Sequence, residues 1–135
     1  MAGKGLKKVR VVAAIIKRGD TVLATQRGYG EFKDWWEFPG GKIEPGETPE
    51  DAILREIREE LDTKIEIVRP VIDVSYDYDT FHLDMRCFLC KLSDEGFTLL
   101  EHESAAWLDS TNLDTVNWLP ADAEVITAIR EQGIL

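Results

Sequence analysis

The most chemically informative residues of this chain are three glutamates in one short segment, Glu56, Glu59 and Glu60. If residues 49–61 form a helix, which turns by about 100° per residue, the three carboxylates fall within an arc of roughly 100° on one side. Like charges three and four positions apart on a helix repel each other by roughly 0.2–0.5 kcal/mol per pair. Oxygen ligands that project together suit Mg²⁺ or Mn²⁺, and a bound cation would relieve the repulsion.

A solvated acidic face is the alternative interpretation, since this is the usual meaning of a run of charges. The residues before the glutamates favour a site instead. Five residues separate Gly41 from Glu47, and seven separate Glu47 from Arg55, which immediately precedes Glu56. A match of six spaced residues of these types to a known signature sequence would rarely arise by chance, so the pattern as a whole indicates a function.

This spacing resembles the signature sequence of the Nudix hydrolases, which would span about residues 41–63 here. The resemblance implies a Mg²⁺-dependent enzyme, with Mn²⁺ as the alternative ion. It also implies a set of metal ligands, namely Glu56, Glu59, Glu60 and the backbone carbonyl of Gly40. A metal ion in such a site would orient a diphosphate and lower the pKa of a bound water that attacks phosphorus.

The base that deprotonates the water is left open by the signature. In this family it is a glutamate of the signature, here Glu59, or a glutamate of a later loop. Glu101 lies six residues before Trp107, a spacing that resembles MutT-type and CTP-pyrophosphohydrolase relatives, and Glu103 is a further alternative. Either loop glutamate also has an ordinary explanation as a solvent-exposed side chain.

Two signature residues are expected to support the site rather than to bind metal. By resemblance, Glu47 and Arg55 pair and hold the loop 41–47 against the helix. Gly40 and Gly41 have two explanations, either a positive φ near a turn or a close approach of the backbone to the site.

The pattern departs from the family at its end, where Asp62 stands in place of the usual glycine. Glycine there ends the helix in a left-handed conformation, which Asp tolerates better than most residues. The departure therefore predicts a small loss of stability and no loss of chemistry.

Residues 35–44, WWEFPGGKIE, closely resemble the corresponding region of MutT-type nucleoside triphosphatases. The resemblance suggests substrate-binding residues, namely Arg27 and Lys42 for phosphates, Trp35, Trp36 and Phe38 near the base, and Asp122 at the base edge. The ordinary alternatives are surface charges for the two cations, core packing for the tryptophans and an N-cap for Asp122. An Asn at position 122 would point to 8-oxoguanine, whereas Asp resembles cytidine-triphosphate relatives, although Asp-based readers of oxidised purines exist.

Apolar periodicity predicts the scaffold that must position these residues. We expect strands at 8–16, 21–27, 64–78 and 81–92, a short strand near 105–108, and helices at 49–61 and 121–131. In the first helix, Thr48 is the expected N-cap, and the core face is expected to carry Ile53, Leu54, Ile57 and Leu61. A mixed sheet between two helices is an α/β/α sandwich, the Nudix fold that the signature implies. We expect one domain over residues 1–135, with about residues 1–6 flexible.

Composition limits the partners. The net charge of −10 and the absence of a basic stripe argue against binding of nucleic-acid polymers or anionic membranes. No apolar run approaches the roughly 20 residues of a membrane span, and no signal sequence is evident, so a cytoplasmic protein is expected. Cys87 and Cys90 lack matching zinc partners and are expected to pack on opposite faces of a strand.

The leading hypothesis is hydrolysis of a nucleoside triphosphate, oxidised or otherwise modified, to the monophosphate and pyrophosphate. One alternative is the same chemistry on CTP, dCTP or a 5-substituted cytidine nucleotide. The other is a Nudix-fold module that binds a nucleotide without cleaving it, although such modules usually lose signature carboxylates that this chain retains. The sequence leaves a monomer and a homodimer equally open.

Overall fold

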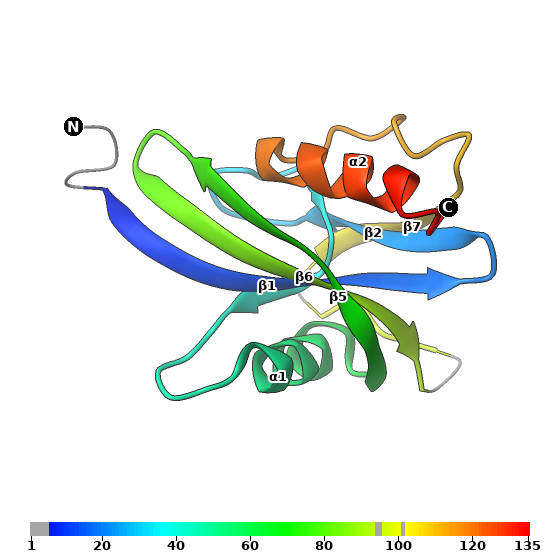
Figure 1. Cartoon of the computed structure of the whole chain (residues 1–135), viewed down its shortest axis with the longest axis horizontal. Coiled ribbons are helices and arrows are strands. Elements are labelled where there is room, and N and C mark those ends of the chain that lie inside the picture. Colours follow the sequence, from blue (N-terminus) through cyan, green and yellow to red (C-terminus); the bar gives the residue numbers. More distant parts are fainter. Residues whose placement is uncertain (1–5, 94–95, 101) are drawn as a thin grey trace.

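A mixed β-sheet lies between two helices in the computed structural model of the chain, which describes residues 6–93, 96–100 and 102–135 (Figure 1). Helix α1 (Pro49–Leu61) covers one face of the sheet and helix α2 (Ala123–Glu131) covers the other. This is the α/β/α sandwich that the sequence predicts. Among the described residues no helix is long and apolar enough to cross a membrane.

The strands run in the spatial order β3-β2-β1-β6-β5, with β4 added beside β1 and β7 beside β2. Their bounds are β1 (Lys7–Arg18), β2 (Thr21–Arg27), β3 (Trp36–Glu37), β4 (Gly40–Lys42), β5 (Ile65–Asp77), β6 (Phe81–Leu92) and β7 (His102–Leu108). A single 3₁₀ turn, Pro120–Asp122, precedes α2. Strands β3 and β4 were not predicted, because two or three residues are too short to show a period.

Strand β1 is the central strand of the sheet. It pairs in parallel with β6 along its length, with β4 at Val11–Ala13, and with β2 only at its last two residues. Successive side chains alternate between the two faces, so Val12 and Ala14 join the core under α1 while Ala13 and Ile15 join the core under α2. The nearly continuous apolar run of β1 follows from this burial on both faces.

Helix α1 begins and ends as its sequence predicts. The hydroxyl of Thr48 accepts a hydrogen bond from the backbone N–H of Asp51 (3.1 Å), and Pro49 occupies the first turn. At the other end, Asp62 adopts the left-handed conformation (φ 48°, ψ 47°) that usually favours glycine. Both ends of the helix that carries the glutamates are therefore fixed by local chemistry.

One prediction for α1 is wrong. Leu54, which was expected to face the core, has 42% of its surface exposed, whereas Ala52 and Glu60 are buried. The buried arc is thus rotated toward the glutamates relative to the apolar stripe. The two cysteines behave as expected, since Cys87 lies in the core under α2 and Cys90 in the core under α1.

We predict that Ile57→Ala lowers the free energy of unfolding by about 2–5 kcal/mol, because Ile57 is fully buried under α1 and its truncation leaves a cavity. The measurement is equilibrium unfolding in urea. Leu54→Ala on the same helix is the matched control and should change stability by about 0.5 kcal/mol or less. Equal losses in the two variants would contradict this description of the core.

Candidate active site

A cleft of about 560 Å³ opens on the α2 side of the sheet. It follows β1 from Ala13, which pairs with Gly40, to Lys7, which pairs with Phe81. Six residues of extended strand span roughly 20 Å. The cleft is thus long enough to hold a group at each of two distant ends.

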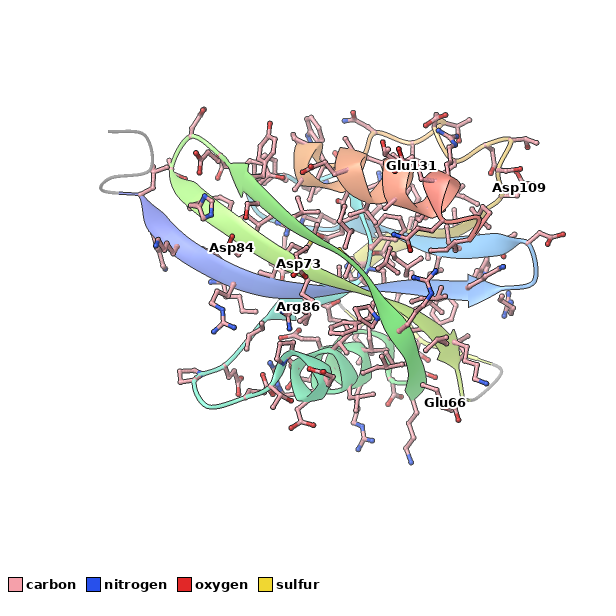
Figure 2. The ribbon with its side chains drawn as sticks, in the orientation of Figure 1. Glu66, Asp73, Asp84, Arg86, Asp109 and Glu131 are labelled. Atoms are coloured by element: carbon pink, nitrogen blue, oxygen red, sulfur yellow. The ribbon has the colours of Figure 1, made fainter. Side chains whose placement is uncertain are left out.

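A second hollow of about 330 Å³ lies near the start of α1, where Asp73, Asp84 and Arg86 project from β5 and β6 (Figure 2). Arg86 is ion-paired there with Asp73, at 3.2 Å between Nε and a carboxylate oxygen. None of the residues that the sequence predicts for the site lines this hollow. The larger cleft is therefore the candidate active site.

The cleft brings together seven of the predicted residues. Its lining includes Arg27, Phe38, Gly40, Gly41, Lys42, Glu60 and Asp122. The tryptophans do not line it, since Trp36 packs against the core under α2 and Trp35 contacts Phe32 edge-on with the ring centroids 6.2 Å apart. Glu101 lies outside the described residues, and Glu103 is ion-paired with Lys33 (3.6 Å) away from the lining.

Glu47 and Arg55 form a bidentate pair directly behind the cleft. Arg55 donates from Nε and Nη2 to the two carboxylate oxygens of Glu47, at 2.8 and 2.9 Å, and from Nη2 to the carbonyl of Lys42, at 2.9 Å. These bonds, helped by the backbone N–H of Glu44, lower the pKa of Glu47 to about 2. The pair ties the loop before α1 to the helix.

The same guanidinium also contacts two of the three signature glutamates. Arg55 Nη1 lies 2.9 Å from a carboxylate oxygen of Glu56 and 3.1 Å from one of Glu59. Arg55 thus offsets part of the repulsion between the glutamates that a bound cation would also relieve. The three carboxylates also differ in environment, since the side chains of Glu56, Glu59 and Glu60 are 14%, 57% and 10% exposed. A solvated acidic face therefore describes Glu59 but not Glu56 or Glu60.

Gly40 and Gly41 are needed for close approach and not for a positive φ. Neither has a positive φ, so that explanation is wrong. A Cβ on Gly40 would lie 1.9 Å from the carbonyl oxygen of Val12, and one on Gly41 would lie 2.3 Å from the carboxylate of Glu56. Their absent side chains let β4 pack on β1 and leave open backbone beside Glu56.

This end of the cleft fits a divalent cation in its chemistry. Of the three helix glutamates Glu60 lines the cleft, and the carboxylate of Glu56 lies beside Gly41 in a space that a single Cβ would fill. Carboxylate oxygens are the ligands that hard cations prefer. The described side chains do not form a completed metal centre, because no three acidic, His or Cys groups among them converge. Two of the expected ligands, Glu56 and Glu59, are instead engaged by Arg55.

A series of polar contacts joins four residues that line the cleft, in the order Arg27, Glu37, His102 and Glu60. Arg27 donates to one carboxylate oxygen of Glu37 (3.0 Å), and His102 Nε2 lies 3.3 Å from the other. His102 Nε2 also lies 3.8 Å from a carboxylate oxygen of Glu60. No local pattern marks Glu37 or His102 as site residues, because their partners come from elements far apart in the chain.

The opposite end of the cleft is aromatic. The ring of Tyr78 is stacked on Phe81 with centroids 4.9 Å apart and lies 5.3 Å from that of Phe32. The Tyr78 hydroxyl accepts a hydrogen bond from the backbone N–H of Ala121 (3.2 Å), which joins this wall to the turn that carries Asp122. These aromatic residues were not among the predicted site residues.

Asp122 is buried beside this wall and makes no capping hydrogen bond with α2, which weakens its explanation as an N-cap. Its pKa is raised well above the ordinary range, first by loss of solvation and then by the charge of Glu37, with Arg27 opposing the shift. The shift favours the protonated form of the carboxyl group, which can both donate and accept a hydrogen bond.

Comparison with known proteins agrees with this geometry. The NUDIX domain family model matches residues 7–129. A putative 8-oxo-dGTP diphosphatase 2 of Mycobacterium tuberculosis is 34% identical over 83% of this chain and 81% of its own length. The CTP pyrophosphohydrolase of Escherichia coli is 47% identical over 42% of each chain.

A solved structure shows the same relationship. The solution structure of a MutT protein of the Nudix family from methicillin-resistant Staphylococcus aureus 252 superposes with a TM-score of 0.72 and 39% identity, covering 93% of this chain and 95% of that one. The chain belongs to the Nudix family. It is accordingly an enzyme, a Nudix hydrolase of the MutT-like kind.

The two glycines predict different defects when each is replaced by alanine. Gly40→Ala should destabilise the protein, because its Cβ meets the backbone of β1 and a strand must shift. Gly41→Ala meets the end of a side chain, so it should largely spare stability but displace Glu56 and lower hydrolytic activity. Thermal melting and a hydrolysis assay on both variants check this, and a stable, fully active Gly40→Ala would contradict the close approach.

The buried carboxyl of Asp122 predicts a pH dependence of stability. Because its pKa is raised in the folded protein, its contribution is fully present below the ordinary aspartate range, about pH 4, and is lost as pH rises toward the raised pKa. Asp122→Asn removes this contribution. The free energy of unfolding of the wild type relative to Asp122→Asn should therefore fall as the pH rises above about 4, and parallel pH profiles would contradict the burial of this carboxyl group.

Proposed function

We propose that this protein hydrolyses an oxidised or otherwise modified nucleoside triphosphate to the monophosphate and pyrophosphate, with Mg²⁺ as the metal ion. The observation that carries the proposal is that one cleft has Glu60 and the bare backbone of Gly40 and Gly41 at one end, and at the other an aromatic wall that a hydrogen bond joins to the turn carrying Asp122. Its volume lies within the range of small-molecule sites, roughly 300–1,000 Å³. The first end suits a metal-bound diphosphate and the second suits a base.

Glu56, Glu59, Glu60 and the carbonyl of Gly40 would hold the ion, as the signature implies. When bound, Mg²⁺ neutralises charge on the diphosphate and lowers the pKa of a coordinated water. Arg55 orients the carboxylates through its bonds to Glu56 and Glu59.

The remaining roles are phosphate binding, by residues that line the cleft, and proton transfer, by a glutamate. Arg27 and Lys42 line it and supply positive charge for the phosphates, although Arg27 is already paired with Glu37. Water attacks phosphorus, the anhydride bond between the α- and β-phosphates breaks, and a glutamate takes the proton. Glu59 is one candidate for this base and Glu101 is the other.

The protonated carboxyl of Asp122 favours particular bases. It offers one donor and one acceptor side by side, which complements O6 and N7–H of 8-oxoguanine. Unmodified guanine presents two acceptors, O6 and N7, at the same edge, so one hydrogen bond is lost. Tyr78 and Phe81 provide a surface on which the base can stack, a contact worth about 1–3 kcal/mol per base.

Cytosine is the alternative that the same observation supports. Its N4 amino group and N3 also present one donor and one acceptor, which suits CTP or dCTP. The relative named for 8-oxo-dGTP matches over 83% of this chain and the one named for CTP over 42%, so we place the oxidised purine first. A module that only binds nucleotides is disfavoured because Glu56, Glu59 and Glu60 are all retained.

Pyrophosphate release from 8-oxo-dGTP, dGTP, CTP, dCTP and 5-methyl-dCTP, with Mg²⁺ and with chelator, tests the proposal. We expect metal-dependent turnover with 8-oxo-dGTP preferred over dGTP. Glu59→Gln is the test variant for catalysis, because the Glu59 side chain is exposed and its replacement leaves packing intact. This change should cut turnover by roughly 10²-fold or more if Glu59 acts in catalysis. Preference for cytidine nucleotides would select the alternative, and no turnover on any of them would contradict the proposal.

A further inference from the structure

His102 lies in the cleft between Glu37 of β3 and Glu60 of α1. It is one of only two histidines in the chain and begins strand β7. Its side chain lines the cleft yet is only 5% exposed. A polar ring held this far from solvent depends on protein groups for its hydrogen bonds.

Its two ring nitrogens have different surroundings. Nε2 faces carboxylate oxygens of Glu37 and Glu60, at 3.3 and 3.8 Å. Nδ1 is buried and has no hydrogen-bond partner in the part of the chain that the structure describes. In the neutral ring the proton therefore belongs on Nε2, where the acceptors are, and Nδ1 carries none. The 3.3 Å contact is within hydrogen-bond reach, and the 3.8 Å contact is electrostatic.

Backbone hydrogen bonds position the strand that carries His102 and the described residues on either side of it. In the register of β2 and β7, His102 lies opposite Arg27, and Glu37 lies on β3 at the other edge of β2. On the other side, the backbone N–H groups of Leu100 and Thr98 donate to the carbonyls of Glu60 and Leu61, at 2.9 and 2.7 Å. Thr98 and Leu100 are thus attached to the last turn of α1.

We propose that His102 is a positioning residue that orients Glu60 toward the metal end of the cleft and Glu37 toward Arg27. The ring joins the helix that carries the metal ligands to the strands that carry the phosphate-binding arginine. Removing its N–H takes away one of the contacts that orient Glu37, beside that from Arg27, and the electrostatic contact with Glu60. The inference rests on the proposed function, because it assigns Glu60 to the metal.

The test is Mn²⁺ affinity, measured by electron paramagnetic resonance without nucleotide, in three variants of His102. His102→Leu keeps bulk and removes the donor. His102→Gln places an amide N–H near the position of Nε2, whereas His102→Asn places it near Nδ1. His82→Leu is the matched control, since His82 also contacts two carboxylates, Asp77 and Asp84, but does not line the cleft.

We expect His102→Leu to weaken Mn²⁺ binding by roughly 10-fold or more, the usual effect of losing a group that orients a ligand. His102→Gln should recover most of the affinity, and His82→Leu should leave it unchanged. In turnover, kcat should fall more than KM rises. If His102→Leu does not fold, as judged by thermal melting, the comparison of His102→Gln with His102→Asn tests the role of the ring. We then expect the Gln variant to bind Mn²⁺ more tightly than the Asn variant.

Equal Mn²⁺ affinity in wild type, Leu, Gln and Asn proteins would overturn the role of His102 and leave the proposed function intact. A wild type that binds no Mn²⁺ would overturn both. A wild type that binds Mn²⁺ and responds to His102 changes, but cleaves no nucleotide, would support the positioning role while contradicting the proposed function.

Discussion

The site depends on the guanidinium of Arg55. Its five hydrogen bonds reach both oxygens of Glu47, the carbonyl of Lys42, and the carboxylates of Glu56 and Glu59. One planar group thereby fixes the loop, the end of β4 and the acidic face of α1 relative to one another. Lysine has no fork of donors and could not serve all of these acceptors at once. The acidic helix is tolerable in this protein because its repulsion is offset from within.

The scaffold then divides the cleft into two ends. Strand β1 is buried on both faces and carries β4 on one edge and β6 on the other, so the open backbone at Gly40 and the aromatic Phe81 are placed by the same strand. The second group of strands, β3, β2 and β7, contributes the polar residues between them. Main-chain pairing therefore positions Gly40 and Phe81 at the two ends, whereas Tyr78 and Asp122 lie outside the strands.

What the sequence predicts well is local. The helix 49–61, its cap at Thr48 and its left-handed end at Asp62 follow from neighbouring residues, and the spacing of the signature identifies the pairing of Glu47 with Arg55. The contact between Glu37 and His102 depends on the registers of β2 with β3 and β7, which no local pattern encodes. The burial of Glu60 in place of Leu54 depends on how α1 rolls on the sheet. Tyr78 enters the site only because its hairpin packs near the turn before Asp122.

The most direct test of this account is a crystal structure of the protein with Mg²⁺ and a nucleoside triphosphate analogue whose α–β bridge cannot be hydrolysed. The account predicts the ion and the diphosphate at Gly40, Glu56 and Glu60, and the base against Tyr78 with its edge on Asp122. A nucleotide bound at the second hollow, beside Asp73 and Arg86, or with its base at the α1 end of the cleft, would contradict it.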